Sequence, residues 1–142
     1  MSTSVPDEHI PELQRLKDIS ERLLSPEVYQ RIVEEAPIAL LAVDDKGRVV
    51  LFNRQSELLL GYSRLEVIGQ SVEMFVPDAR RAVHVVHRAK YSQDPQVRPM
   101  GRDLDLEARQ KSGNTIPVYI TLAPLVTTDG IFTMAAIRRK DT

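Results

Sequence analysis

The sequence of 142 residues contains no cysteine, and this absence removes several kinds of function at once. Without thiols the chain cannot form a disulfide framework, bind a metal through thiolates or use a cysteine nucleophile. A cofactor attached through sulfur is excluded for the same reason. Any site in this chain must therefore work without sulfur chemistry of that kind.

The chain also lacks an excess of charge of one sign and a long apolar run. Nineteen Lys and Arg residues stand against twenty Asp and Glu residues, a net charge of −1, which points to neither nucleic acid nor a membrane surface as a partner. No stretch approaches the roughly 18 apolar residues that span a bilayer. Residues 1–11 lack the basic and apolar segments of a secretory signal. We expect a soluble, cytoplasmic protein with one main domain.

Recognised catalytic motifs are missing as well. The sequence has no phosphate-binding glycine-rich loop, no His-Glu-x-x-His motif and no nucleophile elbow. Its acidic residues are spread over predicted turns and helix caps, where a structural role is sufficient. We predict that the chain is not an enzyme.

Residues 1–36 are predicted to form a helical extension that precedes the main domain, residues 37–142. From residue 10 to residue 24 apolar side chains recur at spacings of three and four, which is typical of an amphipathic helix. This stripe must be buried, either against the chain's own domain or against the same helix of a second chain. In a homodimer the interface would contain Ile10, Leu13, Leu16, Ile19 and Leu23.

A second helix and a β-hairpin are predicted next. Ser25 can cap the helix, Pro26 suits its first position, and Pro37 disfavours helix in the residue before it. Two short apolar runs, residues 38–43 and 49–52, then flank a glycine-containing turn. This pattern is typical of a β-hairpin.

Capping signals divide residues 53–91 into several short helices and one longer helix. Asn53 stands at an N-cap position, and Gly61 can close the first short helix in the left-handed conformation. A capping box begins at Ser63, and the longer helix is expected over residues 79–91.

The remaining chain is predicted to be a loop followed by strands. Residues 92–101 contain two prolines and a glycine and are expected to be a loop. The last 40 residues alternate apolar and polar side chains between short turns, which predicts three strands. With the first hairpin they form a five-stranded antiparallel sheet with helices packed on one face, an α+β fold.

The order and spacing of these segments resemble the PAS family. The matching segments lie within about residues 38–138 and are 44–48 (DDKGR), 52–53 (FN), 60–63 (LGYS), 66–70 (EVIGQ), 76–78 (VPD), 109–114 (RQKSGN), 116–118 (IPV) and 135–138 (AAIR). The resemblance implies the strand order second, first, fifth, fourth, third, known as B-A-I-H-G. It also implies a pocket between the sheet and the helices of the middle segment.

The candidate polar residues of this pocket come from the motif positions and from the loop that would close over it. They are Asn53, Arg88, Tyr91, Met100 and Arg102. Two of them have simpler alternatives: Asn53 can act only as a helix cap, and Arg102 can pair only with Asp78 or Asp103. A core filled by its own Leu, Val and Met side chains would leave no ligand cavity.

Haem is the cofactor that the resemblance raises, because oxygen-sensing members carry the iron-ligating histidine on the longer helix. In those members the arginine matching Arg88 lies near the haem propionates, and the arginine matching Arg102 faces the bound gas. An alignment without gaps, however, puts Ala82 at the ligand position, and His87 could serve only after a shift of the helix. We therefore expect no cofactor and no metal. The usual photochemistry of light-sensing members is excluded because it requires cysteine.

These inferences predict a signal-transduction module of a bacterial-type regulatory pathway, such as a two-component system. It would sense a small molecule, bind a partner protein, or both, as a homodimer. The alternatives are a haem-based gas sensor and a ligand-free dimerisation adaptor. The family's Asp-Ile-Thr signature is absent after Arg138, so a free-standing module and a piece of a longer sensor with an unknown effector both remain open.

Overall fold

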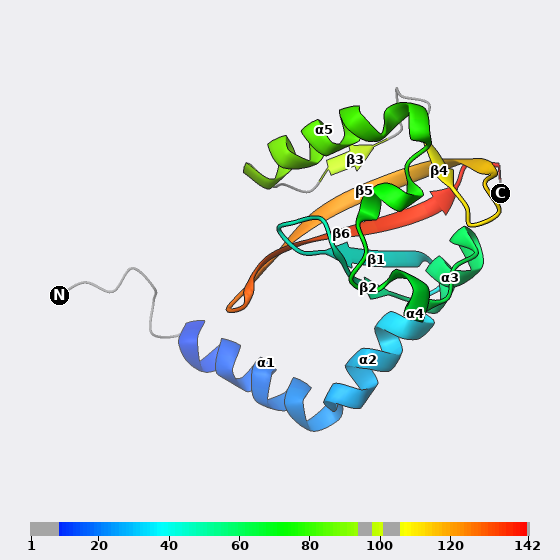
Figure 1. Ribbon diagram of the computed structural model, residues 1–142. Helices are drawn as coiled ribbons and strands as arrows, with labels where there is room; N and C mark the ends of the chain where they lie inside the picture. The colour runs from blue at the N-terminus through cyan, green and yellow to red at the C-terminus, as the bar shows by residue number, and fades with distance from the viewer. Residues whose placement is uncertain (1–8, 94–97, 101–105, 142) are drawn as a thin grey trace. The chain divides into compact units, whose positions relative to one another are not determined.

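The computed structural model describes residues 9–93, 98–100 and 106–141 and divides the chain into two compact units. The first unit, Met1–Val33, contains helix α1 (His9–Leu23) and most of helix α2 (Pro26–Glu35). The second unit, Glu34–Thr142, contains the sheet and the other helices (Figure 1).

Helix α1 leaves its apolar stripe exposed. Four of the five candidate interface side chains are described, and their exposed fractions are 62% for Leu13, 58% for Leu16, 39% for Ile19 and 72% for Leu23. The side chain of Ile10 lies outside the described residues. The following helix begins as predicted, because the N–H of Val28 donates a hydrogen bond to Oγ of Ser25 at 3.3 Å.

The sheet is antiparallel throughout and has the predicted order, with its fifth position shared by two short strands. The strands are β1 (Ala39–Val43), β2 (Val49–Phe52), β3 (Arg98–Met100), β4 (Glu107–Arg109), β5 (Thr115–Thr127) and β6 (Gly130–Arg139). The order is β2-β1-β6-β5-β3, and β4 also pairs with β5. Strands β3 and β4 pair with successive parts of β5, residues 120–122 and 115–117. The order B-A-I-H-G is thus confirmed.

The predicted loop over residues 92–101 is wrong in part. Helix α5 continues to Gln93, and Arg98–Met100 form strand β3. The two prolines in this stretch suggested a loop, but β3 stands at the end of the strand order, where Pro99 needs no donor for a further ladder. Of the three strands predicted over the last 40 residues, the first is present in the described residues as the short strand β4.

Asp44 and Gly47 shape the turn between β1 and β2. The Asp44 carboxylate accepts hydrogen bonds from the backbone N–H groups of Lys46 and Arg48, each at 2.9 Å, and pairs with Nε of Arg48 at 2.9 Å. Burial alone would raise the pKa of Asp44, but these hydrogen bonds outweigh it and lower the pKa. Gly47 has φ of 77°, a conformation that side chains disfavour.

Residues 53–93, the described part of the chain between β2 and β3, form five helical segments with the predicted caps. They are α3 (Arg54–Leu60), α4 (Arg64–Val67), the 3₁₀ turns η1 (Val72–Phe75) and η2 (Asp78–Arg80), and α5 (Arg81–Gln93). Asn53 caps α3, and Gly61 closes it with φ of 82°. The capping box is also confirmed, since the N–H of Ser63 donates to Oε1 of Glu66 at 3.1 Å.

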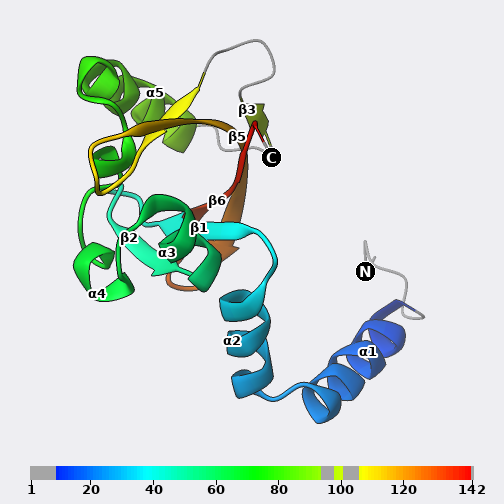
Figure 2. The ribbon, with the colours of Figure 1, turned by 90° about the vertical axis from the view of Figure 1, so that its right-hand side faces the viewer.

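The core lies between the sheet and this helical segment (Figures 1 and 2). Its fully buried apolar side chains come from both layers: Val49, Phe52, Leu60, Val67 and Val118. The rings of Phe52 and Phe75 stack with centroids 5.6 Å apart, and Tyr62 meets Phe75 edge-on at 5.7 Å. Burial of these side chains supplies the main favourable term in folding. The helical segment is therefore packed against the sheet, as the predicted pocket requires.

Candidate functional site

The candidate residues lie on two separate parts of the helical segment. Asn53 is at the N-terminus of α3, whereas Arg88 and Tyr91 are on α5. Met100 is the last residue of β3, and its side chain lies outside the described residues, as does the whole of Arg102. The structure thus places two polar centres at opposite ends of one segment, and each is built differently.

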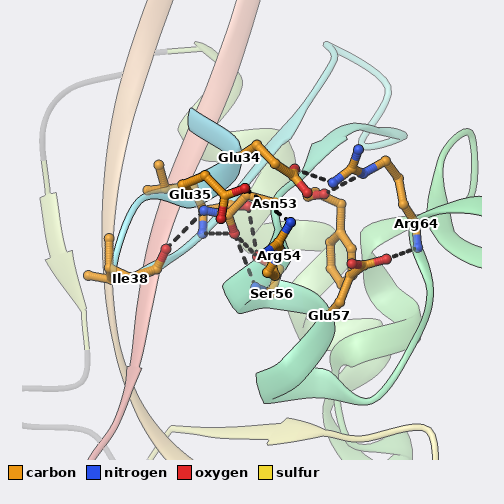
Figure 3. Close-up of polar contacts among 10 residues, drawn as sticks. Glu34, Glu35, Ile38, Asn53, Arg54, Ser56, Glu57 and Arg64 are labelled. Carbon is orange, nitrogen blue, oxygen red and sulfur yellow. Dashed lines mark hydrogen bonds and ion pairs between the residues drawn. The ribbon is translucent and has the colours of Figure 1, made fainter. Parts of the chain in front are cut away.

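Asn53 forms the first centre, a buried and uncharged one (Figure 3). Its Oδ1 accepts hydrogen bonds from the backbone N–H of Leu40 at 2.9 Å and of Ser56 at 3.1 Å. Its Nδ2 donates to the carbonyl of Ile38 at 3.0 Å, and the Ser56 hydroxyl donates to the carbonyl of Leu40 at 2.7 Å. Asn53 therefore has the capping role and also joins α3 to β1. Its role in ligand binding stays a prediction.

Glu73 forms the second centre, a charged one that the sequence analysis missed. Arg88 donates from Nε and from a terminal nitrogen to the two carboxylate oxygens of Glu73, at 3.2 and 3.1 Å. Nδ1 of His84 lies 2.8 Å from Oε2, and the Ser71 hydroxyl donates to Oε1 at 3.0 Å. Three donors from two elements thus converge on one carboxylate, of which 13% is exposed.

The protonation of Glu73 follows from these contacts. Burial alone would raise the pKa of Glu73, but the hydrogen bonds from Arg88, Ser71 and His84 and the charge of Arg88 outweigh it and lower the pKa. Glu73 is therefore a carboxylate near neutral pH. As a carboxylate it holds α5 to η1 through charge-assisted hydrogen bonds, which are stronger than neutral ones.

Gly47 completes this centre from the β1–β2 turn. A Cβ atom built on Gly47 would lie 2.5 Å from Cζ of Arg88 and 2.6 Å from one of its terminal nitrogens. The guanidinium group therefore lies directly against the glycine backbone, and no other residue could stand there without displacing it. The sequence showed Gly47 only as a turn residue, because the approach of Arg88 depends on the packing of α5.

The described side chains of α5 show which face points inward. Tyr91 is buried, His84 and Arg88 are partly buried, and Val86 and His87 are exposed. His84, Arg88 and Tyr91 are separated by four and three residues, so they share one face of the helix. The spacing of the apolar residues alone would favour an inward face that contains Val86, with His84 nearly opposite, but Val86 is exposed and His84 is partly buried. His87 faces solvent in the structure.

An open depression of about 310 Å³ borders the charged centre. Its lining residues are Gln70, Ser71, Glu73, Met74 and Arg81. Nε of Arg81 donates to the backbone carbonyls of Glu73 and Val76, each at 3.1 Å. These hydrogen bonds hold the arginine against the backbone of η1 and the residue after it. A small polar ligand placed here would contact Glu73 itself.

Within residues 9–93, 98–100 and 106–141 no helix is long and apolar enough to cross a membrane. The same residues contain no cluster of three or more His, Cys, Asp or Glu side chains that could hold a metal ion.

Comparison with known proteins identifies the fold and the family. A family model of the PAS fold matches residues 27–141. The sensor protein FixL of Bradyrhizobium diazoefficiens is 29% identical over 112 residues, which are 77% of this chain and 22% of that protein. The oxygen sensor protein DosP of Escherichia coli is 24% identical over 106 residues, 75% of this chain and 13% of that protein.

A solved structure supports the same fold. The PAS domain of an HTR-like protein from Haloarcula marismortui has a TM-score of 0.62 at 20% identity, covering 91% of this chain and 98% of that one. The chain spans about a fifth or less of the length of the two curated relatives, 22% and 13%. Since the family model covers most of the sequence, residues 27–141, the chain belongs to the PAS-fold family.

Proposed function

We propose that this chain is a sensory PAS module that receives a signal at α5 and transmits it as a homodimer in a bacterial-type regulatory protein. The observation that carries this proposal is the charged centre, where one carboxylate, Glu73, holds α5 through Arg88 and His84. A ligand or partner that competes for Arg88 changes how α5 packs. Such an effector needs only to bind more tightly to one of two arrangements of α5, the one with Arg88 paired to Glu73 or the one with this pair broken.

Two relatives support the sensory part of the proposal. The names of FixL and DosP describe a sensor protein and an oxygen sensor protein. We propose that this chain shares the sensory role, acts in the cytoplasm, has no catalytic activity of its own and binds neither nucleic acid nor membrane.

The homodimer would use the exposed stripe of α1. Leucines exposed by 58% to 72% are costly to leave in water, and contiguous apolar surfaces of this kind mark interaction sites. In analytical ultracentrifugation we expect the full chain to dimerise and the double variant Leu16→Asp, Leu23→Asp to dimerise at least about tenfold more weakly, since burying an unpaired charge costs more than 1.4 kcal/mol.

Leu65 provides a matched control for this experiment. It is 95% exposed on α4, outside the proposed interface. Leu65→Asp should leave the dimer unchanged. A dimer that survives both substitutions on α1 would remove this interface from the proposal.

The sensory part is tested separately by native mass spectrometry and a thermal-shift screen of small carboxylates and other metabolites. A ligand that binds only the folded state raises the melting temperature. We expect a retained or stabilising ligand in the wild type and a weaker effect in Arg88→Gln. If no compound stabilises the protein and no small molecule is retained, the adaptor without a ligand is the better assignment.

A haem-based gas sensor is the second candidate, and the similarity to an oxygen sensor protein favours it. The histidines of α5 do not stand where the family's iron ligand belongs. The resemblance puts Ala82 at that position, and His87 is exposed. We therefore propose no cofactor. A Soret band in the purified protein, lost on substitution of either histidine, would reverse this choice.

A further inference from the structure

The last turn of α2 carries charges that a helix end disfavours. Its final two residues, Glu34 and Glu35, are acidic, and the last turn contains no basic residue. The C-terminal end of a helix bears partial negative charge, so acidic side chains there are destabilising. Pro37 follows two residues later and prevents the helix from continuing. On its own, this turn is poorly stabilised.

Two arginines from the helical segment neutralise these charges (Figure 3). Arg64, the first residue of α4, pairs with Glu34, and Arg54, the first residue of α3, pairs with Glu35 at 3.0 Å. Glu34 and Glu35 belong to the same compact unit as the sheet. The two ion pairs therefore join the end of α2 to the beginnings of α3 and α4.

The position of Arg64 depends on the packing around it. Its Nε donates to the backbone carbonyl of Phe52 at 3.0 Å, at the end of β2. Its backbone N–H donates to Oε2 of Glu57, on α3, at 2.7 Å. A change in how α3 and α4 lie on the sheet would therefore move the guanidinium away from Glu34.

Both ion pairs are partly exposed, which makes them suitable for release. The exposed side-chain fractions are 44% and 25% for Arg64 and Glu34, and 54% and 37% for Arg54 and Glu35. Exposed pairs are screened by salt and contribute modestly. They can thus open without unfolding the domain, whereas the buried Asn53 contacts beside them cannot.

We propose that Arg54 and Arg64 form a releasable ionic clasp, through which the packing of α3 and α4 determines whether the last turn of α2 is helical. This regulation rests on the proposed sensory function, because it supplies the route from the repacked helices to the segment before the domain. When the clasp opens, Arg54 and Arg64 no longer offset the unfavourable interaction of the two glutamates with the helix dipole, and the turn frays.

Hydrogen exchange in the full-length chain tests the clasp by the sign of the effect. In Glu34→Gln, Glu35→Gln we expect the amides of residues 32–35 to exchange about two- to fivefold faster, the size expected for exposed ion pairs. Without a clasp, removal of two negative charges from the C-terminal end would slow exchange instead. Slower or unchanged exchange overturns the proposal.

Substitutions on the other side of the clasp provide the matched test. Arg54→Gln leaves the sequence of α2 intact and should also accelerate exchange at residues 32–35, and Arg64→Gln should do the same if it folds. Arg48→Gln is the control, because Arg48 is 55% exposed and pairs with Asp44 in the β1–β2 turn. It should leave α2 unchanged. Equal exchange in Arg54→Gln and wild type would refute the clasp.

The dimerisation and ligand measurements separate this inference from the proposed function. A chain that dimerises and binds a ligand but shows no change in exchange is a sensor without the clasp. A chain with the expected exchange changes but no dimer or ligand keeps the clasp and loses the sensory role.

Discussion

The Asn53 and Glu73 centres hold the two ends of the same helical segment by different means. Asn53 is 1% exposed and joins α3 to β1 through uncharged hydrogen bonds with backbone groups. Glu73 joins η1 to α5 through a carboxylate and the side chains of Arg88 and His84. The stability of the Asn53 centre should not change with pH or salt concentration, because it contains no charged group. The stability of the Glu73 centre depends on charge.

This difference indicates where a signal can enter. Buried uncharged groups that already have hydrogen-bond partners are not available to bind a ligand. Breaking their hydrogen bonds costs the full desolvation penalty of the groups left unpaired. Glu73, by contrast, is a partly buried carboxylate that itself lines an open depression together with its partner Ser71, so a ligand bound there can compete for its hydrogen bonds. We expect the Asn53 contacts with β1 to be the fixed end of the segment and the α5 end to be the responsive end. The partly exposed ion pairs of Arg54 and Arg64 can open without breaking the Asn53 contacts.

The largest effect is expected at the fixed end. Asn53→Ala leaves the N–H of Leu40 and the carbonyl of Ile38 without their partner and removes the cap of α3. Such losses cost about 1–3 kcal/mol per buried group, so we expect the free energy of unfolding in urea to fall by about 3 kcal/mol. Asn114→Ala, in an exposed turn, should change it by less than about 0.5 kcal/mol. Equal losses in the two variants would contradict the comparison.

An intermediate effect on stability is expected where Arg88 of α5 lies against Gly47 in the β1–β2 turn. Gly47→Ala places a side chain in a left-handed conformation, which costs about 1–2 kcal/mol, and also displaces Arg88. We expect a total loss of about 2 kcal/mol in the wild type and about 1 kcal/mol in an Arg88→Ala background. This double-mutant cycle isolates the contact. The same loss in both backgrounds would show that the guanidinium does not depend on the glycine.

The smallest effect, and the one that separates the two centres most clearly, is the pH dependence of Glu73. Because the pKa of Glu73 is lowered in the folded state, its charge stabilises the fold above the unfolded-state pKa of about 4.3. This stabilisation is lost as the pH falls through the lower folded-state pKa. We expect Glu73→Gln to be about 1 kcal/mol less stable than the wild type at pH 7.

That difference should shrink when urea unfolding is repeated at decreasing pH below 5. The cost of Asn53→Ala should stay constant over the same range, since no ionisable group is removed. A gap between Glu73→Gln and wild type that does not change with pH would mean that the charged centre is not held by its carboxylate.

Sequence reasoning predicted the local elements well because their causes lie within a few residues. The caps at Ser25, Asn53 and Ser63 and the left-handed close at Gly61 depend on contacts no more than four residues apart. The strand order came from the resemblance to a family rather than from the residues. Strand β3 was missed because Pro95 before it and Pro99 within it outweighed a pairing with β5 that only the folded sheet supplies.

The amino-acid sequence alone therefore determined the helices, the hairpins and the absence of any cysteine chemistry. Only the tertiary structure decided which charges meet: Glu73 with Arg88, fifteen residues apart, and Glu34 with Arg64, thirty residues apart. With 19 basic and 20 acidic residues the chain allows many such pairings, and a charge has no preferred partner along the sequence. The fold selects among them, because an ion pair acts over a few ångströms and the packing of α5, α4 and the end of α2 sets those distances.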